Sequence, residues 1–171
     1  MSTELFTDSL AEETLSGIGF DLQEVSDRVM EAFLTVTECP YEAHADISVI
    51  GEDEMHDLNL RTRGIDDATD VLSFPASAYE RPEDYASAEN DADAFEPDSG
   101  ELLLGDVVIS WPHVQRQALS YGHSEMREFA FLLTHSLLHL ADHDHMEEDE
   151  RERMEERQRE ILGACGIGRD A

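Results

Sequence analysis

Three histidines in the last third of the chain have the types and spacing that can do chemistry. Residues 135 to 145 read His-Ser-Leu-Leu-His-Leu-Ala-Asp-His-Asp-His. On a helix, His135 and His139 leave the same face one turn apart, and a turn that uses Asp142 in the left-handed conformation can return His145 as a third ligand. Three imidazoles are a ligand set of catalytic zinc sites. The spacing therefore predicts one zinc ion per chain, bound by His135, His139 and His145.

Such a site predicts a hydrolase. Zinc held by three histidines keeps a fourth position for water and lowers the pKa of that water towards about 7, so a nucleophile exists at neutral pH. The competing interpretation, hydrogen-bonded core histidines, explains one residue better than three at this spacing. His143 is expected on the surface rather than as a fourth ligand. Four further histidines are assigned no role: His44, His56, His113 and His123.

The same histidine spacing occurs in metzincin proteases, where a glutamate beside the first histidine is the general base. In this chain Ser136 occupies that position. A peptidase would therefore lack its proton acceptor, so the metal site is predicted more firmly than proteolysis.

Periodic apolar residues predict the elements that position these histidines. A buried central helix, capped by Ser124 and continuing to Leu140, should carry His135 and His139. Gly105 is expected at a bulge or close approach within a strand. The remaining predictions are helices over 22–36, 52–63, 111–121 and 147–162 and strands over 45–50, 71–75 and 102–109.

The length of 171 residues fits one domain. The element order predicts an α+β, zincin-like fold with a small mixed sheet and helices around the metal-binding helix. Residues 1–20 show weak periodicity and are expected to be a loosely held lead-in. Residues 76–100 hold eight acids and almost no large aliphatic side chains, so a solvated, mobile insertion is expected there.

The charge is strongly unbalanced, with 41 acidic against 11 basic residues and a net charge of −30; every basic residue is arginine. A salt-adapted proteome and a deliberately altered sequence both explain this pattern. The field repels polyanions at long range, so a nucleic-acid role would need a local arginine cluster, a metal or a partner surface. The acidic N-terminus and the distant Cys39 and Cys165 indicate a cytoplasmic protein without membrane segments.

The histidine segment resembles the H-G-x-L-H-L-x-G-Y-D-H motif of the YbeY family of bacterial endoribonucleases, departing from it at Ser136, Asp142 and His143. Two further blocks agree with that family. Residues 58–75 resemble L-N-x-x-Y-R…T-D-V-L-S-F-P, and residues 104–110 resemble L-G-D-I-V-I-S. The resemblance covers about residues 45 to 162.

This resemblance implies a zinc-dependent, single-strand-specific endoribonuclease of rRNA processing and ribosome quality control. It implies RNA, namely the 16S rRNA of the small ribosomal subunit, and the Era GTPase as partners, but neither DNA nor membrane. Arg63 matches the arginine thought to line the RNA cleft, where a guanidinium can clamp a phosphate; Arg61 could assist. An ordinary helix-surface arginine is the alternative interpretation of Arg63.

Two other functions stay open at this point. One is a zinc metallopeptidase or another zinc hydrolase that acts on small molecules. The other is a non-catalytic ribosome-assembly adaptor whose zinc only holds the turn.

Overall fold

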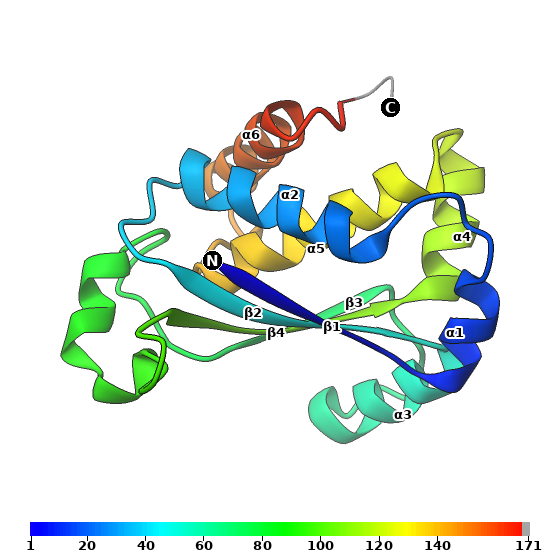
Figure 1. Ribbon diagram of the computed structural model, residues 1–171, viewed down its shortest axis with the longest axis horizontal. Coiled ribbons are helices and arrows are strands. Elements are labelled where there is room, and N and C mark those ends of the chain that lie inside the picture. Colours follow the sequence, from blue (N-terminus) through cyan, green and yellow to red (C-terminus); the bar gives the residue numbers. More distant parts are fainter. Residues whose placement is uncertain (169–171) are drawn as a thin grey trace.

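The computed structural model describes residues 1–168 as a four-stranded mixed sheet covered by helices (Figure 1). The elements in chain order are β1 (Ser2–Thr7), α1 (Ser9–Leu15), α2 (Leu22–Val36), β2 (Ala43–Ile50), α3 (Glu52–Arg63), β3 (Val71–Pro75), the 3-10 helices η1 (Tyr85–Asn90) and η2 (Ala92–Ala94), β4 (Leu102–Ser110), α4 (Trp111–Tyr121), α5 (Glu125–Leu140) and α6 (Glu148–Ala164). The strand order is β1-β2-β4-β3, in which only β3 is antiparallel to its neighbour. The predicted α+β class with a mixed sheet is confirmed.

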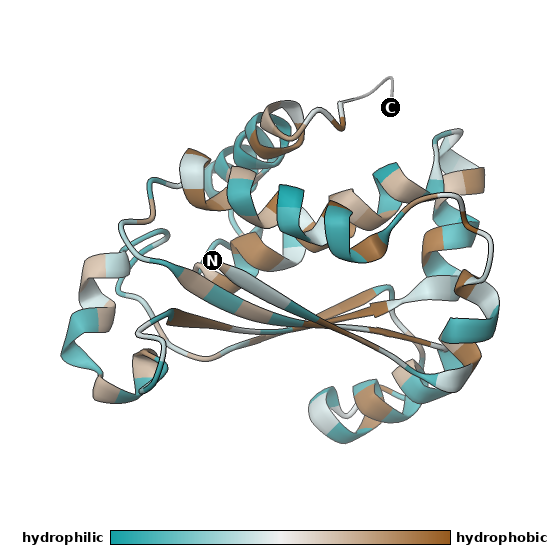
Figure 2. Cartoon of the chain, in the orientation of Figure 1, coloured by the Kyte–Doolittle hydropathy of each residue, from teal (hydrophilic) through white to brown (hydrophobic). Residues whose placement is uncertain are grey.

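Helices α2, α5 and α6 lie on one side of the sheet, and α3 lies on the other (Figure 1). Hydrophobic residues gather on the sheet and on the helix surfaces turned toward it (Figure 2). Alternate residues of β2, such as Ile47 and Val49, are fully buried in the main core, together with Phe129 and Leu133 of α5. Helix α5 is thus the central buried helix that its apolar circumference predicts.

The local signals of α5 act as expected. The Ser124 side chain accepts a hydrogen bond from the Arg127 N–H and caps the first turn. The preceding helix, α4, ends at Gly122, whose φ of 72° is left-handed. These two residues fix where α5 starts.

Gly105 holds the close contact between β3 and β4. Its φ is 133°, and a Cβ atom there would lie 2.2 Å from the carbonyl oxygen of Phe74. The register between β2 and β4 also shifts opposite this glycine, at His44/Ala45. Only glycine fits this position, so the expected bulge and close approach are both present.

The expected loose lead-in is wrong for most of residues 1–20. Residues Ser2–Thr7 form β1, an edge strand parallel to β2. The Asp8 carboxylate then accepts hydrogen bonds from the N–H groups of Ala11 and Gly51, which caps α1 and ties it to the end of β2. Backbone pairing, which needs no large apolar side chains, orders this segment.

Residues 76–100 also differ from expectation, because four of their side chains are buried: Tyr79, Tyr85, Ala88 and Ala94. The Tyr85 hydroxyl lies 2.6 Å from Thr37 Oγ1 of the residue that ends α2. The buried contacts of this segment therefore come from alanine and tyrosine side chains, although the segment has almost no large aliphatic residues. The mobility of this segment and the single-domain organisation stay predictions. Among the residues described, no helix is long and apolar enough to cross a membrane.

Candidate metal centre

His135, His139 and His145 converge as their spacing predicts. One ring nitrogen of each lies within 4.8 Å of those of the other two. The Nε2 atoms of His135 and His139 are 3.1 Å apart, and the ring centroids of His145 lie 5.7 Å and 5.3 Å from those of His135 and His139. Three imidazole nitrogens in one small space are a donor set that zinc accepts, so these residues fit the predicted ion.

The loop after α5 returns His145 to the helix. Asp142 takes a φ of 70°, and the His143 N–H donates to the carbonyl of Leu138 at 2.9 Å. The left-handed turn is therefore made by aspartate, one of the few residues other than glycine that adopt it readily. The predicted turn geometry is confirmed.

The outward nitrogens of both helix histidines have partners. His139 Nδ1 lies 2.9 Å from the carbonyl oxygen of His143, and His135 Nδ1 lies 2.6 Å from the side-chain amide of Gln158 in α6. A metal on Nε2 requires a proton on Nδ1, so Gln158 would present its amide oxygen there. Such outer contacts orient ligand histidines and raise their basicity. Sequence reasoning missed Gln158, which lies 23 residues from His135.

Burial prepares the two helix histidines for metal binding. It lowers the pKa of His135 to about 4, with further lowering from the charges of His139 and His145. Burial also lowers the pKa of His139. Both imidazoles are therefore neutral at pH 7, which is the form that binds a metal ion.

His143 is buried, with 6% of its surface exposed, so the expected surface position is wrong. Its Nε2 lies 2.7 Å from Glu83 Oε1, and Arg157 Nε donates to the same oxygen at 2.8 Å. Burial opposes ionisation of Glu83, but hydrogen bonds from His143 and Arg157 outweigh it and lower the pKa of this carboxyl. Glu83 thus joins the 76–100 segment to α6 and to the loop after α5. Because the His143 carbonyl contacts His139, Glu83 also helps to position His139.

Replacing Glu83 with glutamine should weaken zinc binding about 10-fold, at the lower end of the effect of outer contacts on metal affinity. The variant keeps the side-chain shape but loses an acceptor and the charge that holds His143 and Arg157 together. Competition with a zinc-binding dye measures the affinity. Asp98→Asn removes a charge from an exposed position in the same segment and should leave the affinity unchanged. Equal zinc affinities for both variants would contradict this role of Glu83.

A hollow of about 440 Å³ lies beside the triad, and we call it the metal pocket. It is lined by the three histidines, by Arg63 at the end of α3, and by Asp70 and residues of β3. Arg63 is exposed and makes no ion pair with any of residues 1–168. Arg61 does not line the hollow. The metal pocket therefore lies between α5 and the Arg63 segment, and the Arg63 guanidinium on its wall has no ion-pair partner within the described residues.

Ser136 joins the two walls of the metal pocket. Its buried hydroxyl lies 2.6 Å from that of Ser73 in β3, which lines the pocket. The residue beside His135 thus makes a structural hydrogen bond and supplies no carboxylate.

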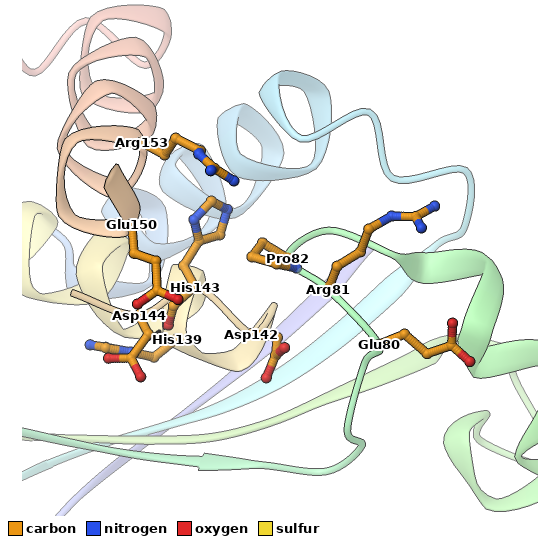
Figure 3. A pocket seen from close by; sticks show the side chains of 9 residues that line it. All are labelled: Glu80, Arg81, Pro82, His139, Asp142, His143, Asp144, Glu150 and Arg153. Atoms are coloured by element: carbon orange, nitrogen blue, oxygen red, sulfur yellow. Dashed lines mark hydrogen bonds between the residues drawn. The ribbon is translucent and has the colours of Figure 1, made fainter. Parts of the chain in front are cut away.

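A second hollow, of about 390 Å³, also has His139 in its lining (Figure 3). Four carboxylates line it, from Glu80, Asp142, Asp144 and Glu150, against the guanidinium groups of Arg81 and Arg153. A phosphate is repelled more strongly here than in the metal pocket, where Asp70 is the one lining carboxylate.

Glu128 is a buried acid that sequence reasoning missed, because it resembles an ordinary acid in the first turn of a helix. It is 1% exposed and lies on α5, seven residues before His135. Burial, reinforced by the charge of Asp70, raises its pKa to about 7. His123 Nε2 lies 2.8 Å from its Oε2 atom. Burial therefore favours the protonated form of this carboxyl.

Glu128→Gln should become more stable relative to wild type as the pH rises. The wild-type folded state keeps a proton between the ordinary pKa of 4.5 and about 7, so its stability falls as the pH rises through this window. Glutamine does not titrate, so the difference in the free energy of unfolding between variant and wild type should rise by up to about 3 kcal/mol from pH 4 to pH 8. Denaturant unfolding at both pH values measures it, and a pH-independent difference would contradict the raised pKa.

Another group of metal-ligand residues lies away from the triad, on β1 and β2. Ligand atoms of Glu4, His44 and Asp46 are also within 4.8 Å of one another. Both ring nitrogens of His44 already have partners, in Ser2 and Asp46. This group is explained by its own hydrogen bonds and ion pair.

The mixed sheet, the buried helix α5 and the three-histidine centre define an α+β protein with a metal site suited to hydrolysis. The family model for Endoribonuclease YbeY matches residues 10–166. A protein of that name from Agathobacter rectalis is 48% identical over 162 residues, which cover 94% of this chain and 98% of the relative. Another, from Lachnoclostridium phytofermentans, is 45% identical over 161 residues with the same coverage. The chain belongs to the YbeY family and is an endoribonuclease, hence a hydrolase.

A solved structure also matches the fold. The solution structure of TM1509 from Thermotoga maritima matches with a TM-score of 0.54 and 19% sequence identity, over 95% of this chain and 90% of that chain. At this identity the match supports the fold alone.

Proposed function

We propose that this chain is a zinc-dependent, single-strand-specific endoribonuclease that acts in the cytoplasm on the 16S rRNA of the small ribosomal subunit, in rRNA maturation and ribosome quality control. The observation that carries the proposal is the position of Arg63. Its guanidinium, which has no ion-pair partner among residues 1–168, lines the same hollow as the three histidines. A metal centre and a free cation on one pocket suit the cleavage of a phosphodiester.

The residues divide the work in this proposal. His135, His139 and His145 would hold the zinc ion, which would supply a Lewis acid and lower the pKa of a water molecule. Arg63 holds two oxygens of that phosphate and stabilises the charge that develops on them. Gln158 and the His143 carbonyl keep the two helix histidines oriented throughout.

The net charge of −30 constrains how RNA reaches this site. Long-range attraction cannot guide it, because the overall field is repulsive. We propose that a protein partner on the ribosome, with the Era GTPase as the candidate, brings the RNA close enough for Arg63 to bind it. RNA cleavage should therefore be faster on ribosomal particles with this partner than on free RNA.

The test compares three substrates on zinc-loaded protein: a single-stranded RNA, the same RNA annealed to its complement, and an unstructured peptide. Cleavage of the single strand alone supports the proposal. Peptide cleavage with intact RNA would favour the metallopeptidase, although Ser136 offers no carboxylate beside His135. An Arg63 variant that still supports ribosome assembly would favour the non-catalytic adaptor function.

A further inference from the structure

A third hollow, of about 420 Å³, lies where α4 meets α5, and we call it the base pocket. It is lined by Tyr121, Gly122, His123, Arg127, Glu128 and Phe131. None of these residues lines the metal pocket or belongs to the triad. Two aromatic rings, an imidazole and a guanidinium thus surround a buried carboxyl.

The base pocket adjoins the metal centre. The Phe131 ring stacks on the ring of His135, with centroids 6.4 Å apart and an interplanar angle of 23°. Glu128 lies two helical turns before His135, about 10.5 Å along the axis of α5. Asp70 of the metal pocket is near enough for its charge to act on Glu128. A strand bound at the metal could therefore continue into this hollow.

The rim of the base pocket carries an uncovered aromatic ring. Tyr121 is 70% exposed, and within residues 1–168 the one ring that contacts it is that of His123, with centroids 5.8 Å apart. Exposed aromatic rings are the surfaces on which single-stranded RNA bases stack. Stacking on a neutral base gains affinity without bringing another phosphate into the acidic field of this protein.

The interior of the base pocket holds an imidazole beside a buried carboxyl, with His123 Nε2 2.8 Å from Glu128 Oε2. The Glu128 carboxyl is 1% exposed and can both donate and accept hydrogen bonds when it is protonated. Buried polar groups of this kind are normally hydrogen-bonded, so they suit a ligand whose edge carries hydrogen-bond donors and acceptors.

We infer that the base pocket binds one unpaired nucleobase of the RNA substrate, next to the nucleotide whose phosphate lies at the metal. The inference rests on the proposed function. The base would stack on Tyr121 and present its polar edge to His123 and Glu128. A base held in a duplex cannot enter the hollow, so this pocket would also account for single-strand specificity.

The experiment uses a labelled single-stranded RNA with a mapped cleavage site, and a series of the same RNA with one abasic nucleotide at each flanking position. Binding by fluorescence anisotropy and kcat/KM are measured on zinc-loaded wild type, Tyr121→Ala and Leu119→Ala. Leu119 is 86% exposed on the same helix and does not line the pocket. It is therefore the matched control.

Tyr121→Ala should weaken RNA binding on the order of 5- to 100-fold, the range for loss of one base stack. An abasic nucleotide at one position should weaken RNA binding by wild type by a similar factor. The same abasic RNA should cause little further loss of binding in Tyr121→Ala. Leu119→Ala should behave as wild type. Abasic penalties that are equal in wild type and Tyr121→Ala would overturn the inference, and so would the absence of RNA binding. RNA binding with this pattern but no cleavage would keep the base pocket and refute the proposed nuclease function.

Discussion

His139→Ala should bind less than one zinc ion per chain and lose RNA cleavage by a factor on the order of 10³, because the metal supplies several kcal/mol of transition-state stabilisation. His139 contacts both other histidines: its Nε2 lies 3.1 Å from that of His135, and its ring centroid lies 5.3 Å from that of His145. Two remaining histidines are too few for a tight zinc site. Elemental analysis and an RNA cleavage assay on the same sample measure both effects.

His56→Ala is the matched control for this loss. His56 lies on α3 and pairs with Asp66 at 2.6 Å, away from the metal pocket. This variant should keep its zinc and its activity. Full zinc content and full cleavage in His139→Ala would show that the triad is not the metal centre.

Arg63→Ala should lower kcat/KM for RNA by about 100-fold while the zinc content stays that of wild type, because a group that stabilises transition-state charge is lost and no ligand is removed. Arg63→Lys should recover part of the rate, since lysine restores the charge but not the two-point geometry of a guanidinium. Steady-state kinetics on zinc-loaded protein measures both variants.

Arg61→Ala separates the local role of Arg63 from a general effect of charge. Both arginines are exposed on the last turn of α3, but only Arg63 lines the metal pocket. Arg61→Ala should therefore stay within about 2-fold of wild type, as surface substitutions away from specific contacts usually do. Equal losses of kcat/KM in Arg61→Ala and Arg63→Ala would mean that only the net charge of the protein affects RNA cleavage.

Features set by neighbouring residues were predicted well from the sequence. The cap at Ser124 and the close approach at Gly105 each follow from the local chemistry of one residue type. The i, i+4 spacing of His135 and His139 fixes their common face as soon as α5 is helical. The three metal-ligand candidates could therefore be proposed without a structure.

Features set by distant contacts could not be predicted. β1 is a polar edge strand whose order comes from backbone pairing with β2, which leaves little trace in its hydropathy. His143 is buried because Glu83, sixty residues earlier, receives its side chain. The buried state of Glu128 likewise depends on α4 and His123 as well as on its own helix. In each case the decisive partner lies on another element.

The most direct test of a metal-dependent endoribonuclease is the zinc content of the full chain, measured together with cleavage of single-stranded RNA before chelation, after chelation and after zinc is restored. We expect one zinc ion per chain, loss of cleavage with the metal, and recovery of both on reloading. Cleavage that persists at full rate in protein free of metal would contradict the role given to His135, His139 and His145.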